Sequence, residues 1–201
     1  MLRATELRLD GLGPVSLEVA AGECLCLMGP SGAGKTRLLR AIADLDPHGG
    51  DVFLDGVSSH QVPAPEWRRQ VALLPAESHW WSERVGEHFA AGDVAGLQFL
   101  GFEPDVLGWS VARLSSGERQ RLALLRVLAL VPRVLLLDEP TANLDPANIE
   151  RVETLLTDYR CARSAALLWV SHDAAQAARV GQRMLRMEKG RLDADRPGIR
   201  Q

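Results

Sequence analysis

The chain has 201 residues, of which 46% are hydrophobic and 24% are charged, and these are ordinary values for one folded globular domain. The formal net charge of −3 provides no overall basic field of the kind that attracts nucleic acid, so no nucleic-acid partner is expected. Residues 1–10 mix charged and apolar types, so no secretory signal is expected there, and the longest apolar run, 122–131, is shorter than the roughly 20 residues of a membrane-spanning helix.

Short apolar or alternating runs, separated by turns, predict a series of strands. The predicted strands are 2–9, 15–19, 23–28, 51–54, 71–74, 134–137 and 165–170, followed by a closing hairpin of 184–187 and 191–192. Segments with the apolar spacing of helices lie between them at 35–45, 118–130, 146–160 and 174–180. Residues 77–111 are also mostly helical in composition, with turns near Gly92, Gly101 and Gly108, whereas Pro63 and Pro65 indicate a loop.

Strands that alternate with helices in this way predict an α/β fold, in which helices flank a mostly parallel sheet. The chain shows no internal repeat and no low-complexity linker, so 1–201 is expected to form a single domain. A short helical subdomain at about 78–125 is the part expected to project from it.

The segment 29–36, GPSGAGKT, follows a predicted strand and precedes a predicted helix. It matches G-x-x-x-x-G-K-[ST], a pattern in which backbone N–H groups and a helix N-terminus surround phosphate. Lys35 is expected to reach the β- and γ-phosphates, and the hydroxyl of Thr36 to ligate Mg²⁺; the alternative is a glycine-rich turn without a ligand. The residues predicted to bind nucleotide are Gly29, Pro30, Ser31, Gly32, Ala33, Gly34, Lys35, Thr36 and Arg37.

Two acids follow directly after the apolar run 134–137. A carboxylate at the end of a buried strand is costly unless it faces a cation or hydrogen-bond donors. Asp138 is therefore predicted to hold the Mg²⁺ shell, and Glu139 to act as the general base that polarises the attacking water. The alternative is a surface turn that carries two solvated acids.

The segment 114–121, LSSGERQR, resembles the LSGGQ signature of the ATP-binding cassette (ABC) family, in the variant that ends E-R-Q-R. The resemblance implies that Ser115, Ser116, Gly117 and Glu118 contact the ATP of a partner subunit. A simpler role is also open, because Ser115 and Glu118 have the spacing of a helix capping box.

Two further segments resemble motifs of the same family. Residues 141–145, TANLD, resemble the D-loop, although Asp145 also suits the N-cap of the helix that begins at Pro146. Residues 171–173, SHD, resemble the switch-histidine motif, so His172 is expected to contact the γ-phosphate. Five motifs in this order imply the P-loop NTPase fold of an ABC ATPase, with a RecA-like core, a small antiparallel β part and a short helical subdomain.

The chain departs from the family at three places. Ala76 stands where the family usually has a glutamine that contacts Mg²⁺, and either Glu77 replaces that glutamine or a water fills the gap. The first strands lack the aromatic residue that commonly stacks on adenine. The helical lobe is short, and the aromatic pair Trp80 and Trp81 either belongs to a docking surface at its edge or fills its core.

The resemblance implies a subunit that binds and hydrolyses Mg-ATP as a head-to-tail homodimer and drives a separate integral membrane permease. Such a subunit is cytoplasmic and lies on the inner face of the cell membrane. Residues 166–173 and the compact lobe look most like small two-component exporters, including those assigned to metal export. The alternatives are a non-transport ABC ATPase and a nucleotide-dependent regulatory module without turnover.

Overall fold

The structure is a computed structural model that describes residues 1–89, 94–193 and 196–197. Its N-terminal part is a four-stranded antiparallel sheet in the order β2-β1-β4-β5. The strands are β1 (Leu2–Leu9), β2 (Leu12–Val19), β4 (Gly49–Leu54) and β5 (Val57–Ser58). The alternating burial of β1 and β2 agrees with a sheet that has one solvated face. The predicted small antiparallel part is thereby confirmed.

The second sheet has the order β10-β9-β3-β8-β7-β6, and β11 (Arg196–Pro197) pairs with β9. Strands β9, β3, β8, β7 and β6 run parallel. The strands are β3 (Cys24–Met28), β6 (Val71–Leu74), β7 (Val134–Asp138), β8 (Ala166–Val170), β9 (Arg183–Glu188) and β10 (Arg191–Leu192). The predicted mostly parallel sheet and closing hairpin are confirmed.

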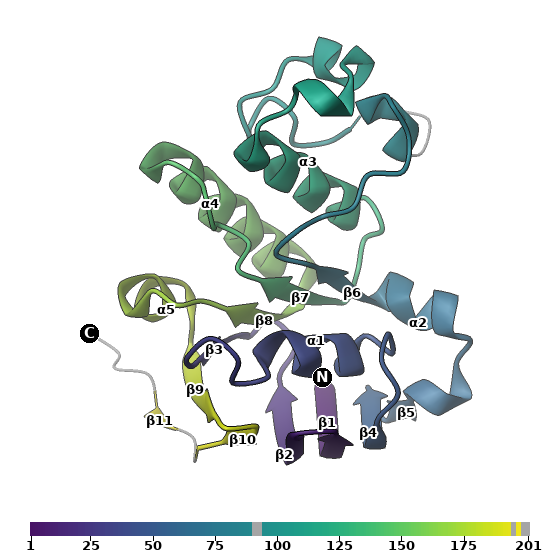
Figure 1. Ribbon diagram of the computed structural model, residues 1–201, viewed down its shortest axis with the longest axis vertical. Coiled ribbons are helices and arrows are strands. Elements are labelled where there is room, and N and C mark those ends of the chain that lie inside the picture. The colour runs from purple at the N-terminus through teal and green to yellow at the C-terminus, as the bar shows by residue number, and fades with distance from the viewer. Residues whose placement is uncertain (90–93, 194–195, 198–201) are drawn as a thin grey trace.

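Helices cover both faces of this sheet (Figure 1). They are α1 (Lys35–Ile42), α2 (Ala64–Gln70), α3 (Ser116–Leu128), α4 (Pro146–Arg163) and α5 (Ala174–Val180). Because successive strand residues point to opposite faces, β7 and β8 contribute to two cores. Leu136 and Leu168 pack with the N-terminal sheet and α1, whereas Leu137 and Trp169 pack with α3 and α4 on the other side.

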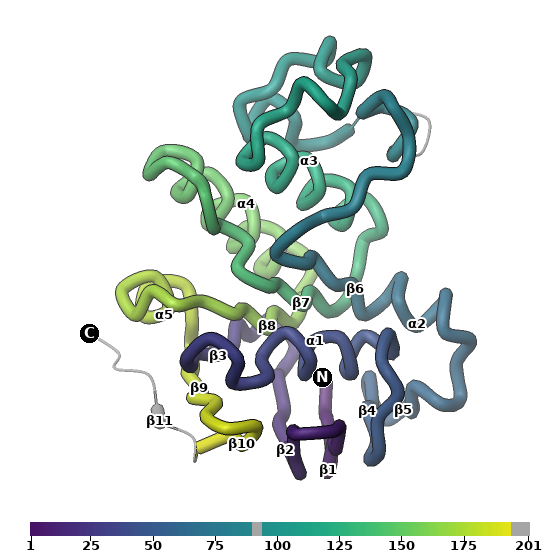
Figure 2. The backbone as a smooth tube through the Cα atoms, viewed as in Figure 1, coloured from purple at the N-terminus to yellow at the C-terminus, as the bar shows by residue number. Residues whose placement is uncertain are grey.

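The prediction that 77–111 is mostly helical was wrong for the described residues. Between β6 and α3 these form only single 3₁₀ turns, at Val85–His88, Pro104–Gly108 and Val111–Arg113. Gly101, with φ +79°, and Pro104 interrupt any continuous helix. The predicted turn near Gly92 lies outside the described residues. Figure 2 shows the chain leaving the lower part after β6, winding through this lobe and returning along α3.

The loop expected around Pro63 and Pro65 is a short helix, α2, which follows a 3₁₀ turn at Ser59–Gln61. Proline fits the first turn of a helix, since the N–H it lacks would have no partner there. Trp67 anchors α2, because it is 1% exposed and its Nε1–H donates to the Ile42 carbonyl at 3.0 Å. None of the described helices is both long enough and apolar enough to cross a bilayer.

Candidate active site

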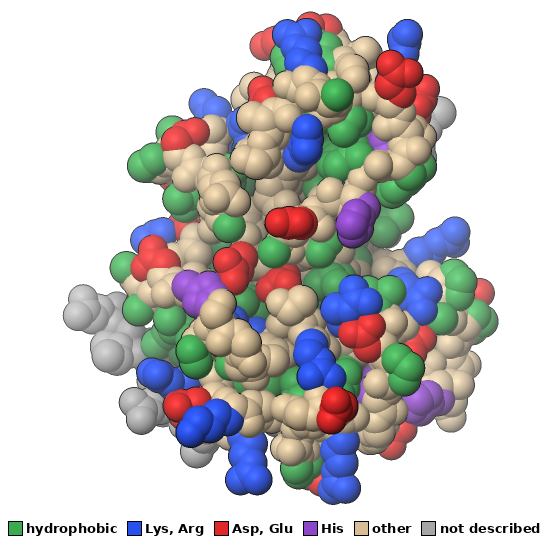
Figure 3. All heavy atoms as spheres, in the orientation of Figure 1, with side chains coloured by type: hydrophobic (Ala, Val, Ile, Leu, Met, Phe, Trp, Pro, Cys, Tyr) green, Lys and Arg blue, Asp and Glu red, His purple; other side chains and the backbone are tan. Residues whose placement is uncertain are grey.

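Three predicted motifs follow adjacent strands: the phosphate-binding loop 29–36, called the P-loop from here on, the acids 138–139 and the histidine segment 171–173. The P-loop follows β3, Asp138 ends β7, and His172 comes two residues after the end of β8, which lies between these two strands. Parallel strands bring their carboxyl ends to one edge of the sheet, which is where ligands bind in α/β folds. Along the waist between the lobe and the lower part, acidic and histidine side chains gather (Figure 3).

The P-loop closes on itself in a conformation that needs glycine. Gly29 has φ +149°, and a Cβ there would lie 2.1 Å from the Met187 carbonyl oxygen, on β9. Gly34, with φ +104°, is the N-cap residue of α1. Lys35 is only 6% exposed, and its Nζ donates to the carbonyls of Gly29 at 2.8 Å and Pro30 at 3.0 Å. Burial lowers the pKa of Lys35, against the opposing effect of Glu139 and Asp138, so an anion that replaced these carbonyls would favour its charged form.

Thr36 and Asp138, the two predicted Mg²⁺ ligands, are in contact. The Thr36 hydroxyl donates to Asp138 Oδ2 at 2.8 Å, and Asp138 is 2% exposed. Burial raises the pKa of Asp138, although the hydrogen bond from Thr36 opposes this. Mg²⁺ is usually held by one or two carboxylates together with phosphate oxygens, and this hydroxyl–carboxylate pair beside the P-loop fits that donor set. In the described part of the chain, no group of three acidic, histidine or cysteine side chains forms a separate metal site.

Glu139 and His172 also meet, although they belong to different loops. His172 Nε2 lies 2.8 Å from Glu139 Oε1, and the two side chains are 42% and 35% exposed. Glu139 has φ +51°, an uncommon conformation for a residue with a side chain, and its N–H donates to the Val170 carbonyl at 3.2 Å. In this arrangement the Glu139 carboxylate can accept a proton, and the His172 ring can present a nitrogen to an anion beside it.

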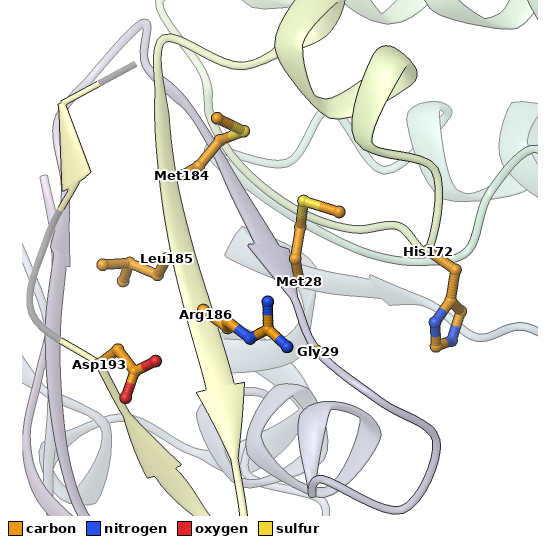
Figure 4. A pocket seen from close by; sticks show the side chains of 7 residues that line it. All are labelled: Met28, Gly29, His172, Met184, Leu185, Arg186 and Asp193. Atoms are coloured by element: carbon orange, nitrogen blue, oxygen red, sulfur yellow. The ribbon is translucent and has the colours of Figure 1, made fainter. Parts of the chain in front are cut away.

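His172 lies between two cavities. One, of about 290 Å³, lies along β9, and Figure 4 shows the Arg186 side chain in it reaching toward Met28 and Gly29. The other, of about 190 Å³, contains Glu139 and is bordered by Gln176 of α5. Both cavities therefore have access to the edge at which the P-loop and the acids meet.

The predicted signature residues, 115–118, do not lie with the P-loop, Asp138, Glu139 and His172. They begin α3 in the lobe, whereas the P-loop precedes α1 in the lower part of the molecule (Figure 1). The capping box that the spacing suggested is present: Glu118 N–H donates to Ser115 Oγ at 3.2 Å, and Ser115 N–H donates to Glu118 Oε2 at 2.8 Å. The role of these four residues toward ATP stays a prediction.

Asp145 and Glu77 also stay predictions as functional residues. Asp145 caps α4 as expected, since its Oδ1 accepts from the Asn148 N–H at 3.0 Å. Glu77 and Ala76 are exposed beyond the end of β6. Among the described residues, no hydrogen bond or ion pair involves Glu77, so its carboxylate is available to a ligand.

Sequence reasoning missed a buried polar group behind the Glu139–His172 pair. Gln176 of α5 is 5% exposed and bonds to Thr141, Glu153 and Ser171. The signal was a glutamine among the alanines of 174–178, next to Ala177, which is the other buried residue of the mostly exposed helix α5. Such a residue can be recognised as buried only when its partners, which lie in three other segments, are known.

Curated relatives resemble most of this chain. It is 38% identical to the Fe(3+) ions import ATP-binding protein FbpC of Streptomyces coelicolor, over 95% of this chain and 60% of that protein. It is 35% identical to the phosphate import ATP-binding protein PstB of Mycobacterium intracellulare, over 98% of this chain and 79% of that protein. The chain therefore spans less than two thirds of the Streptomyces relative.

Solved structures share the fold. The dimeric ATP-binding cassette MJ0796 bound to ADP and Pi has a TM-score of 0.80 at 23% identity, with all of both chains covered. A bacterial Atm1-family ABC exporter with ATP bound has a TM-score of 0.84 at 25% identity, over 98% of this chain and 38% of that one. A family model described as ABC transporter matches residues 12–142. This chain thus belongs to the ABC transporter family and has the P-loop fold of its ATPase domain, as the motifs predicted.

Proposed function

We propose that this chain is the ATP-binding and ATP-hydrolysing subunit of an ABC transporter, acting as a head-to-tail homodimer around two Mg-ATP. The observation that carries the proposal is the division of the predicted site within one chain. The P-loop, Asp138, Glu139 and His172 share one sheet edge, whereas the signature residues 115–118 lie in the lobe. A second copy in the opposite orientation would supply the missing half.

In the proposed reaction, Lys35 exchanges the Gly29 and Pro30 carbonyls for oxygens of the β- and γ-phosphates. Glu139 accepts a proton from water as the water oxygen attacks the γ-phosphorus and the bond to the ADP oxygen breaks. His172 donates a hydrogen bond to the γ-phosphate and stays close to Glu139. Thr36 and Asp138 would hold Mg²⁺, which when bound neutralises charge on the phosphates.

The partner in the membrane and the location follow from the same proposal. The relatives named above are import proteins for ferric ions and phosphate, and one of the solved structures is an exporter. We propose that a separate permease supplies the membrane span and that this chain lies on the cytoplasmic face. The direction of transport and the substrate are properties of that permease, and export of a metal is the specific hypothesis that the sequence offered.

Light scattering of the Glu139→Gln variant tests the proposal. Without its general base the variant keeps ATP bound, so Mg-ATP is expected to convert it from monomer to dimer, while the parent returns to monomer as it turns ATP over. The turnover number of the variant should fall about 10²–10⁴-fold. If the variant binds ATP but stays monomeric, and the parent does not hydrolyse ATP, the regulatory module is favoured. A dimer that acts on DNA or ribosomes rather than on a permease would favour the non-transport ATPase.

A further inference from the structure

A buried cluster of polar side chains lies behind the Glu139–His172 pair. Gln176 Nε2 donates to Thr141 Oγ1 at 2.8 Å and to Glu153 Oε1 at 2.9 Å, and its Oε1 accepts from Ser171 Oγ at 2.9 Å. All four residues are at most 8% exposed. The cluster therefore joins α4, α5 and the two loops that carry Glu139 and His172.

The chemistry of the cluster specifies a glutamine. Glu153 is ionised and can only accept, so the NH₂ group of Gln176 has to face it and the amide oxygen faces the Ser171 hydroxyl. An apolar side chain of the same size would leave three buried polar groups without this partner, and a glutamate would place a second carboxylate beside Glu153. The amide thus uses both of its N–H groups and one lone pair in a fixed orientation.

Helix α4 and the start of α5 hold this amide in place. Arg179 donates to both carboxylate oxygens of Glu153, at 2.7 Å each, and so fixes the group on which Gln176 rests. Asp173 caps α5, because its Oδ1 accepts from the N–H groups of Ala175 at 2.8 Å and Gln176 at 3.2 Å. The position of Gln176 is therefore tied to the residue that directly follows His172.

The amide acts where the sheet no longer holds the two loops together. The last backbone hydrogen bond from the end of β7 to β8 runs from Glu139 N–H to the Val170 carbonyl. Past that point Ser171 N–H still donates to the Leu27 carbonyl of β3 at 3.4 Å. Among the described residues, the segments 139–144 and 171–173 are joined to each other by the Gln176 bridge and by the Glu139–His172 contact itself. Thr141 is two residues from Glu139, and Ser171 is next to His172, so the bridge acts together with these backbone hydrogen bonds on the separation of Glu139 and His172.

We propose that Gln176 is a positioning residue for hydrolysis, which keeps Glu139 and His172 in contact by bridging Thr141 and Ser171. The inference rests on the proposed function. Gln176 borders the cavity that contains Glu139 and His172 but lies on α5, away from the P-loop residues 29–36. Its loss should therefore change turnover and leave nucleotide affinity alone.

The test compares Gln176→Met with Tyr159→Phe in the full chain. Tyr159→Phe is the matched control, because it removes one part-buried hydrogen bond of α4, to the Pro132 carbonyl at 2.7 Å, away from the loops. Gln176→Met is expected to lower kcat about 10–100-fold with KM for ATP changed less than about twofold, since small misplacements of reacting groups have effects of that size. Tyr159→Phe should leave both constants at parental values. A parental kcat for Gln176→Met, or a loss confined to KM, would overturn the proposal.

Thr141→Val covers the case in which Gln176→Met fails to fold. Valine keeps the shape of threonine and removes only one end of the bridge, so kcat should fall less, again without a change of KM. If Gln176→Met folds, the double variant with Thr141→Val should lose less than the product of the two single losses, because both break one bridge. Independent effects would count against a bridge.

A second measurement separates this inference from the proposed function. The proposed function fails if the parent does not hydrolyse ATP, or if Glu139→Gln hydrolyses it as fast as the parent. In either case the contact between Glu139 and His172 can still be followed through the ¹⁵N resonances of the His172 ring. Gln176→Met should shift them in the same direction as Glu139→Gln does, because both disturb the contact with Glu139. Unchanged His172 resonances in Gln176→Met would exclude the bridge as the element that positions this pair.

Discussion

The central sheet and the lobe of residues 78–125 are stabilised by different contacts. Every residue of β7 and β8 is buried, and apart from Asp138 their side chains are apolar, alternating between two cores. In the lobe and at its boundary, arginines lie over aromatic rings: Arg113 is 3.7 Å from the centroid of Trp109, and Arg126, just after the lobe on α3, is 4.8 Å from that of Trp80. The lobe also has buried apolar residues, among them Val85, Leu100 and Val106. The comparison teaches that the predicted site rests on strands whose side chains are almost all apolar and buried, whereas the lobe adds specific side-chain pairs to its apolar core.

Lys35→Ala should show the largest effect, which is a loss of ATP affinity. The ammonium group is held near the predicted phosphate position by two loop carbonyls, and its loss removes the main cationic contact to the phosphates. We expect ATP to bind about 100-fold more weakly, which corresponds to about 2.8 kcal/mol, in isothermal titration calorimetry. The control is Lys189→Asn, at the other lysine of the chain, where asparagine suits the φ of +48°. Equal affinities in the two variants would exclude the phosphate role of Lys35.

Glu153→Gln tests whether the α4–α5 support of the site contributes to stability through its charge. Burial alone would raise the pKa of Glu153, but the hydrogen bonds from Arg179 and Gln176 outweigh it and leave the pKa below the ordinary value of 4.5. This stabilisation is therefore fully present above about pH 4.5 and disappears as the pH falls through the lower pKa of the folded protein.

In urea unfolding, the parent should exceed Glu153→Gln by about 1–3 kcal/mol at neutral pH, as expected for hydrogen bonds to a buried charge. The difference should shrink as the pH is lowered below about 4.5. A difference that stays constant with pH would mean that shape, rather than charge, is what the carboxylate provides.

Arg126→Met probes the contact between α3 and the lobe. Arg126 lies over the rings of Trp80 and Trp81, at 4.8 and 4.9 Å, and its Nη1–H donates to the His79 carbonyl at 3.1 Å. Cation–π contacts contribute about 0.5–2 kcal/mol each, so the variant should unfold at lower urea with altered tryptophan fluorescence. ATP affinity should not change. The exposed Arg163→Met serves as control, and a loss of ATP affinity in Arg126→Met alone would show that lobe and site are coupled.

Asp138→Asn should have the smallest effect on stability, and it should stabilise the protein rather than destabilise it. Because burial raises the pKa of Asp138, its ionised form at neutral pH costs stability, and the amide removes that cost while keeping an oxygen for Thr36. The melting temperature without nucleotide should rise by about 2–4 °C for each kcal/mol gained. Asp46→Asn is the control, since the hydrogen bond from Arg40 lowers the pKa of Asp46 and the substitution should destabilise. A lower melting temperature for Asp138→Asn would contradict this reading.

The difference between core and lobe also explains what the sequence could predict. Strand β6 and helix α5 occur at the predicted residues, because apolar runs and regular spacing are local signals of buried elements. The lobe could not be predicted in this way. Val85 N–H donates to the Trp109 carbonyl, and Arg84 pairs with Ser110, so the 3₁₀ turns are fixed by partners distant in sequence.

The residues of the candidate site also fall into those that the sequence could predict and those that it could not. The predicted P-loop and acidic motifs are runs of consecutive residues, and the structure brings Thr36 to Asp138 as the motifs implied. The cluster around Gln176 draws one residue each from four segments, and no short pattern joins them. Polar residues that act through tertiary contacts are thus the ones that motif reasoning misses.

The order of the strands has a consequence for biosynthesis. Strand β3, which ends at the P-loop, lies between β8 and β9, so both of its hydrogen-bonding neighbours come from the last 40 residues or so of the chain. On the ribosome, where synthesis runs at about 5–20 residues per second, this apolar strand waits several seconds for a partner. Nascent chains that end between residues 140 and 165 should therefore expose an unpaired Cys24–Met28 edge and be sensitive to proteolysis, although they already contain the P-loop, the signature and both acids.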